Sequence, residues 1–345
     1  MKGGLLQYSG LVTKTKAMQG KLLPGPVLVE LAEYENVNEL ISFLRESEGY
    51  AAIYESHEEI QHRAQVEAVI DDSLYADYGK LYRFAGPEAK RGLKILFLRY
   101  EINVLKNCLE HVWQGGNNTG LGYLKMLFDR HADFDTEKVT RAENRMELQQ
   151  ALEGTEYESL FAGFAESSSL TYADCATQLD IFYYNTAWQM AKRLKNKQMR
   201  EMIFCILGTE IDWQNIMWMY RYKRFFDGKM ADIYDRMIPI RYRLKKEQQR
   251  QLLESGPEEF ASILGQTAYF TEKDAVVRMG DEITYREVMN RTYRQICRKY
   301  PMSLAPVLCY LHDKEQEIDS LTTILEGVRY QVPAKEIQEL VLQTR

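Results

Sequence analysis

Apolar side chains occupy nearly every side of the helix that the stretch 208–226 would form. Four of them share one face at helical spacing: Trp213, Ile216, Met217 and Tyr220. Asp212 and Asn215 share a second face. A helix that is apolar nearly all round is usually buried, because few of its sides can face water. The pattern therefore predicts a helix in the protein core.

The pattern of this central helix recurs in weaker form once on each side of it, at 99–106 and at 314–321. Polar residues stand at matching positions in the three copies: Asn103 in the first, Glu210, Asp212 and Asn215 in the second, Glu315 and Glu317 in the third. Two positions depart from the pattern, since Tyr100 stands where Asp212 does and Ser320 stands where Asn215 does. A shared ligand site would need every position. We therefore interpret these residues as structural, with buried hydrogen bonds between packed helices.

Two further landmarks precede each copy of the pattern. The first is a leucine-rich helical stretch followed by a tyrosine, and these tyrosines are 107 and 112 residues apart: Tyr50, Tyr157 and Tyr269. The second is a polar residue three positions before another tyrosine, 21 to 23 residues further on: Asp72, Asp180 and Asn290. Three landmarks in one order with near-constant spacing indicate an internal repeat.

We therefore expect an all-α protein built from three similar helical units. Residues 1–130 would hold an N-terminal lead and the first unit, residues 131–240 the second unit, and residues 241–345 the third. A chain of 345 residues exceeds the usual size of a single core, which fits an array of like units. Strand-type alternation is nowhere sustained. Three capping boxes mark expected helix starts: Ser56–Glu59, Ser255–Glu258 and Thr284–Glu287.

Composition indicates an ordered, helix-rich protein of the cytoplasm. Hydrophobic residues make up 45% of the chain and charged residues 27%, with eight prolines. The five cysteines are odd in number and form no C-x-x-C pair, as expected of reduced thiols. No apolar run approaches the roughly 18 residues of a membrane span, and the N-terminus has no apolar signal region. Any membrane association should therefore be peripheral.

Each candidate for catalytic or metal chemistry fails on spacing. His57 and His62 are five residues apart, about 140° round a helix, whereas a zinc pair on one helix is four apart. Glu59 and His62 have the spacing of a di-iron motif, but no second such pair exists. The sequence shows no glycine-rich phosphate loop, nucleophile elbow or compact nucleic-acid module. We therefore expect no catalytic residue, no metal, no cofactor and no nucleic-acid partner.

Charge is polarised along the chain. The net charge is −6, yet the segment 192–250 carries 15 Lys and Arg against 7 Asp and Glu, a balance of +8. Such a segment could meet an acidic protein, anionic lipid headgroups or nucleic acid, or it could be a solvated helical face. Charge alone does not choose among these partners.

Together these residues resemble the C subunit of bacterial and archaeal V/A-type rotary ATPases, which is similar to the d subunit of eukaryotic vacuolar proton pumps. The resemblance covers essentially the whole chain. It rests on the three landmark tyrosines and on three further stretches: Glu210–Ile216, Lys314–Leu321 after Pro301, and Pro333–Ile337.

The resemblance implies an all-helical funnel of three like units around a pseudo-threefold axis. It implies a non-catalytic rotor subunit of the central stalk, a socket that joins the central shaft to the membrane proteolipid ring. The complex would drive H⁺ or Na⁺ transport with ATP or synthesise ATP. A helical scaffold or adaptor outside any rotary machine is the alternative, and a helical enzyme is the third.

Rings of this class expose short polar loops, so contact with them should be substantially electrostatic. Four cations in the basic segment are the candidates for such a partner face: Arg241, Arg243, Lys245 and Lys246. A rotor subunit should copurify from detergent-solubilised membranes with shaft and ring, whereas an adaptor should not.

Overall fold

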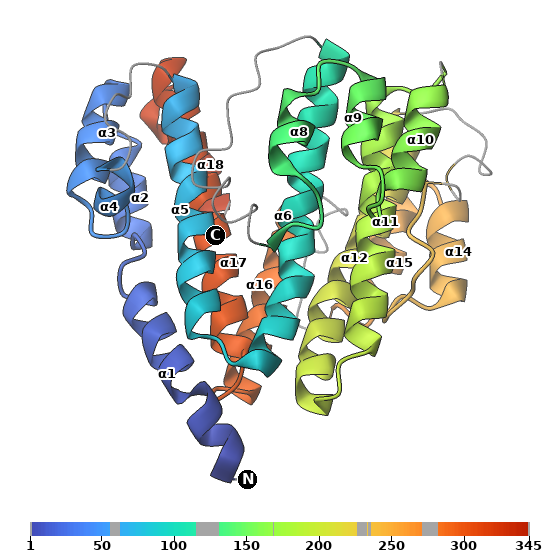
Figure 1. The fold of residues 1–345 in the computed structure, drawn as a ribbon, viewed down its shortest axis with the longest axis horizontal. Coiled ribbons are helices and arrows are strands. Elements are labelled where there is room, and N and C mark those ends of the chain that lie inside the picture. The colour runs from blue at the N-terminus through green and yellow to red at the C-terminus, as the bar shows by residue number, and fades with distance from the viewer. Residues whose placement is uncertain are drawn as a thin grey trace. The chain divides into compact units, whose positions relative to one another are not determined.

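The computed structural model describes residues 2–55, 63–114, 131–167, 169–225, 233, 236–270 and 282–343. These residues form helices and connecting turns and include no strand, which confirms the expected all-α class. Figure 1 shows the helices with their labels. The longer ones are α1 (Lys2–Gln19), α5 (Arg63–Phe84), α6 (Pro87–Gln114), α11 (Tyr172–Lys192), α12 (Lys197–Phe225), α16 (Glu282–Lys299) and α17 (Ala305–Arg329).

Groups of shorter helices come before each pair of long ones along the chain. They are α2 (Gly25–Leu31), α3 (Val37–Glu46), α4 (Ala51–Tyr54), α8 (Thr136–Arg141), α9 (Arg145–Ala151), α10 (Glu158–Glu166), α14 (Lys246–Glu254) and α15 (Pro257–Gly265), with α18 (Ala334–Gln343) at the end. The landmark tyrosines follow α3, α9 and α15, and the three copies of the central pattern lie in α6, α12 and α17. This order agrees with the sequence repeat, and the division into three units stays a prediction.

Internal contacts group the chain into two compact units. Unit 1 consists of Met1–Lys90, Asn103–Leu170 and Tyr300–Arg345, and unit 2 of Arg91–Ile102 and Thr171–Lys299. In unit 1, α17 packs against α1, α2, α3, α5 and α18, so the two ends of the chain share one core. In unit 2, α12 packs against α11, α14, α15 and α16. The units therefore combine parts of different sequence repeats.

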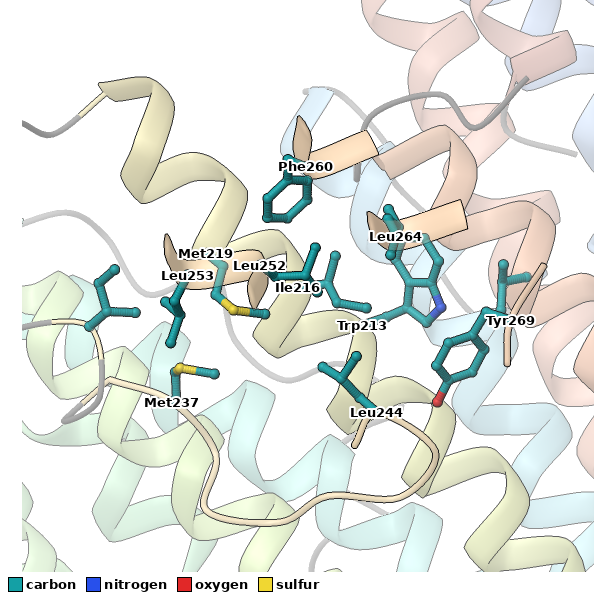
Figure 2. Close-up of a cluster of buried hydrophobic side chains, with 12 residues drawn as sticks. Trp213, Ile216, Met219, Met237, Leu244, Leu252, Leu253, Phe260, Leu264 and Tyr269 are labelled. Atoms are coloured by element: carbon teal, nitrogen blue, oxygen red, sulfur yellow. The ribbon is translucent and has the colours of Figure 1, made fainter. Parts of the chain in front are cut away.

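The predicted central helix is confirmed as the centre of the unit 2 core. Trp213 and Ile216 of α12 have no exposed surface. Figure 2 shows the Trp213 indole beside Leu264 and Tyr269, and its ring centroid lies 6.0 Å from that of Tyr269. Phe260 of α15 and the leucines of α14 complete the cluster. The apolar sides of α12 are thus covered by the long helices α11 and α16 and by the short helices α14 and α15.

Two of the expected capping boxes are wrong, and the third lies outside the described residues. The Ser255 hydroxyl donates to the carbonyl of Leu252 at 3.1 Å and closes the end of α14, so α15 begins at Pro257 without it. Thr284 lies inside α16. A true capping box, which was not predicted, stands at the start of α11, where Thr171 and Asp174 satisfy each other's backbone amides.

Candidate partner surface

The four cations proposed to meet a partner lie just before and at the start of α14. Arg241, Arg243 and Lys245 belong to the loop 238–245, and Lys246 is the first residue of the helix. All four side chains are exposed. None of them lies within salt-bridge distance of a carboxylate in the described part of the chain. Arg243 contacts its own chain, since its guanidinium lies 5.3 Å from the centroid of the Tyr242 ring, and no described carboxylate neutralises any of the four charges.

A buried carboxylate holds the backbone of this loop. Asp212 Oδ1 accepts from the Tyr242 amide at 3.0 Å, and Oδ2 accepts from the Arg243 and Leu244 amides at 2.6 and 2.8 Å. Oδ2 also accepts from the Tyr269 hydroxyl at 2.5 Å. Four donors thus satisfy a carboxylate that has no exposed surface. Burial, followed by the Asp212 charge, raises the pKa of Tyr269, which keeps its proton for this bond.

Two further contacts fix the same loop on α12. The buried Asn215 side chain makes two hydrogen bonds to the backbone of Ile238. Its Nδ2 donates to the Ile238 carbonyl at 3.0 Å, and its Oδ1 accepts from the Ile238 N–H at 2.9 Å. The Tyr242 ring packs against Gly208, where a Cβ atom would overlap it. The four cations therefore extend from a backbone that is held at three points along α12.

Glu317 of α17 is the corresponding buried carboxylate in unit 1, where it accepts hydrogen bonds from several groups. It accepts from the Leu23 amide, from the Tyr50 hydroxyl at 2.7 Å and from Lys314 Nζ at 2.7 Å. Lys314 Nζ also lies 3.8 Å from the centroid of the Tyr50 ring. Burial, followed by the Glu317 charge, raises the pKa of Tyr50. Like Asp212, Glu317 binds a landmark tyrosine and a backbone amide that precedes a short helix.

The remaining repeat positions have different environments. Glu210 is buried and accepts from Arg99 Nη2 at 2.6 Å through both oxygens. Asn103 is exposed, and Glu315 is half-buried. Ser320 donates to the carbonyl of Gln316 in its own helix. Asn103, the counterpart of Asn215 in the first copy, is exposed and does not share its role in holding a loop.

Sequence reasoning missed two cations that complete these contacts. Arg99 pairs with Glu210 across 111 residues of sequence, and no local pattern marks such a pair. Lys314 is 1% exposed and lies three residues before Glu317, a helical spacing that indicates an ion pair. That spacing could have shown the pair but not its burial.

The basic segment 192–250 does not form one surface, because two of its clusters lie well apart along α12. One is the group of four cations at 241–246, on the loop that Asp212 holds. The other lies at the turn between α11 and α12. Lys197, at the start of α12, lies fifteen residues before Asp212 in the same helix. At the rise per residue of an α-helix this separation is about 22 Å.

The described residues contain neither a membrane span nor a metal cluster. None of the helices there is long and apolar enough to cross a membrane. Within the same ranges, no group of three or more His, Cys, Asp and Glu side chains is placed to hold a metal ion.

Comparison with known proteins identifies the family. A family model described as ATP synthase (C/AC39) subunit matches residues 11–340. The C subunit of the A-type ATP synthase of Methanosphaera stadtmanae is 26% identical over 95% of this chain and 86% of its own length. The C subunit of Methanosarcina acetivorans is 25% identical over 94% of this chain and 90% of its own length. The C subunit of Archaeoglobus fulgidus is 23% identical over 98% of this chain and 96% of its own length. The chain therefore belongs to the ATP synthase (C/AC39) subunit family, whose members are structural, non-catalytic subunits of the complex.

Proposed function

We propose that this chain is the rotor subunit of a central stalk, a socket that couples the shaft of a rotary ATPase to the proteolipid ring in the membrane. It sits peripherally on the cytoplasmic face, and its three helical units surround a pseudo-threefold axis as a funnel. The match to the family over residues 11–340 supports this function. The role serves H⁺ or Na⁺ transport driven by ATP and ATP synthesis alike.

The observation that carries the proposal is the way buried carboxylates join successive sequence repeats. Asp212 belongs to the second predicted unit and binds Tyr269 and the loop amides of the third. Glu317 belongs to the third predicted unit and binds Tyr50 and the Leu23 amide of the first. The last repeat is therefore tied back to the first.

A subunit that transmits torque must resist shear between its parts. Hydrogen bonds to a buried charged group are about twice as strong as neutral ones, and breaking one leaves a charge without partners. Such contacts between successive repeats suit a socket that turns as one body. A helical adaptor outside a rotary machine has no such mechanical requirement.

The exposed cations supply the face toward a partner. Arg241, Arg243, Lys245 and Lys246 extend from a fixed loop, so little ordering is needed when they bind. Polar loops of a proteolipid ring fit a surface of this kind better than an apolar partner would. The contact should weaken as salt rises.

Affinity purification of the tagged chain from detergent-solubilised membranes tests the function. We expect native mass spectrometry to find shaft and ring subunits bound to the chain. Recovery of the chain with neither of them, under conditions in which the rest of the complex stays assembled, would establish the adaptor instead. An unrelated tagged protein of similar size and charge controls for adhesion to the detergent micelle.

A further inference from the structure

The turn between α11 and α12 in unit 2 is a compact basic surface, which we call the basic turn. Figure 1 shows these two long helices as neighbours. Its cations are Lys192, Arg193, Lys195, Lys197 and Arg200. The first four are exposed, and Arg200 is half-buried. The stretch 191–201 contains a single acid, Glu201, at its end.

Hydrogen bonds within the turn fix its backbone. Arg200 Nη1 donates to the Leu194 carbonyl at 2.9 Å, and the Asn196 side chain accepts from the Met199 amide at 3.0 Å. Leu194 is buried beneath the turn. The exposed cations are thus displayed on a preformed surface, and a partner that binds them does not have to order the chain first.

The charge of Lys197 is unfavourable for folding at its position, whereas Arg200 is held by its hydrogen bond to the Leu194 carbonyl. The start of a helix is the positive end of its dipole, so cations there are unfavourable and acids are favourable. The helices α6, α11 and α16 carry Glu88, Asp174 and Glu282 in their first turns. The helix α12 begins with Lys197, and its first turn has no acid, as is also true of the first turns of α1, α5 and α17.

Local pairing compensates little of this cost. Lys197 Nζ lies 3.9 Å from Glu201, with both side chains well exposed, and such pairs stabilise weakly. In the described part of the chain, no carboxylate lies within salt-bridge distance of Lys192, Arg193 or Lys195. An anion from outside the chain would offset the repulsion among these cations.

We propose that the basic turn docks on an acidic segment of another subunit of the complex, a loop or helix end that bears Asp or Glu side chains. This inference rests on the proposed function and adds a second contact, about 22 Å along α12 from the loop at 241–246. The turn spans only the few residues between two helices, which fits a narrow acidic segment. In the described part of unit 2 no large apolar side chain is exposed, so this unit offers the turn no apolar anchor for a lipid surface.

Zero-length cross-linking of the purified, intact complex tests the contact. A water-soluble carbodiimide joins a lysine amine to a touching carboxylate as an amide, and the water that is lost hydrates the carbodiimide to a urea. We expect mass spectrometry to find Lys192, Lys195 or Lys197 joined to an Asp or Glu of another subunit. Cross-links that join these lysines only to Glu201 of the same chain would overturn the inference.

A charge-neutralised variant supplies the second test. The triple variant Lys192→Gln, Arg193→Gln, Lys195→Gln leaves the hydrogen bonds of Arg200 and Asn196 in place and removes two weakly stabilising cations at the end of α11, so its melting temperature should fall only slightly below that of the parent. We expect the amount of partner subunits that copurify at low salt to fall about tenfold. The control, Lys138→Gln, Arg141→Gln, Lys335→Gln, removes the same charge from exposed positions in unit 1 and should assemble like the parent.

The outcomes separate this inference from the proposed function. If the parent chain copurifies with no shaft or ring subunit, the proposed function fails. If the parent assembles and the triple variant assembles equally well at low salt, only the basic turn inference fails. It also fails if the parent binds vesicles of anionic phosphatidylglycerol, the triple variant loses that binding, and assembly is unchanged, because the partner is then a lipid surface.

Discussion

The hydroxyl of Tyr269 donates to Asp212 Oδ2 at 2.5 Å and joins two residues that are 57 positions apart. The same oxygen accepts from two backbone amides of the loop that carries the exposed cations. In Figure 2 the hydroxyl points toward Leu244, whose amide is one of these donors. A core contact and the candidate partner surface therefore depend on one carboxylate.

The first prediction removes this hydroxyl. Tyr269→Phe keeps the ring against Trp213 but leaves Asp212 one donor short, so the free energy of unfolding should fall by about 1.5–3 kcal/mol. Urea denaturation followed by circular dichroism measures the loss. Tyr330→Phe is the control, because that ring is 65% exposed and its variant should match the parent. Equal stability of all three proteins would mean that the bond contributes nothing.

The second prediction concerns the core around α12. Trp213→Ala should cost about 3–5 kcal/mol, because it removes a fully buried indole and leaves a cavity. Trp213→Phe should cost less, because it keeps an aromatic ring and removes an indole N–H that has no acceptor among the described residues. The denaturant midpoints of the two variants give the comparison. A midpoint for Trp213→Ala equal to that of the parent would show that the indole is not in the core.

Sequence predicted the parts of this site that repeat or that follow helical spacing. The burial of α12 follows from its apolar faces, and Asp212 and Glu317 were singled out because they match in the repeat. Their partners could not be predicted, because Leu23 and Tyr50 lie 294 and 267 residues before Glu317 and meet it only in the folded chain. Matching positions also proved a poor guide to environment, since Asn103 is exposed where Asn215 is buried.

The third prediction tests the contact between Gly208 and Tyr242. Gly208→Ala places a methyl group where the Tyr242 ring lies, so the ring must move and should pull the loop from Asp212. We expect a loss of about 1–3 kcal/mol, as for an overpacked site. In a Tyr242→Ala background the same substitution should cost much less, and a double-mutant cycle measures the difference. Gly163→Ala is the control, because nothing lies within 4 Å of its added Cβ.

The fourth prediction concerns acid pH and the start of α11. The Thr171 side chain and backbone donate to Asp174, and Arg236 lies 2.8 Å away, so the pKa of Asp174 is lowered from 3.8. A carboxyl group whose pKa is lowered on folding stabilises the protein above its unfolded pKa and loses this effect as the pH falls through the folded value. Asp174→Asn should therefore cost roughly 0.3–1 kcal/mol at pH 7, and this loss should shrink as the pH falls below the unfolded pKa. Melting temperatures measured from pH 7 to pH 3 should converge, and a constant gap would contradict the assignment.

The last prediction tests the face at 241–246 itself. Charge reversal of all four cations to Glu should uncouple assembly more than it unfolds the protein, because the loop is held through backbone amides and the four side chains make no ion pair in the described structure. The parent complex should weaken as salt rises, since exposed charges are screened over about 10 Å at 0.1 M salt. Asp212→Asn is the matched comparison, because it keeps the four cations but weakens the hold on their loop, and it should lower the melting temperature more than the charge reversal does. Native mass spectrometry of complexes at low salt gives the result. If the charge-reversed chain binds shaft and ring as tightly as the parent, these cations are a solvated face, and the socket must contact its partners through other surfaces.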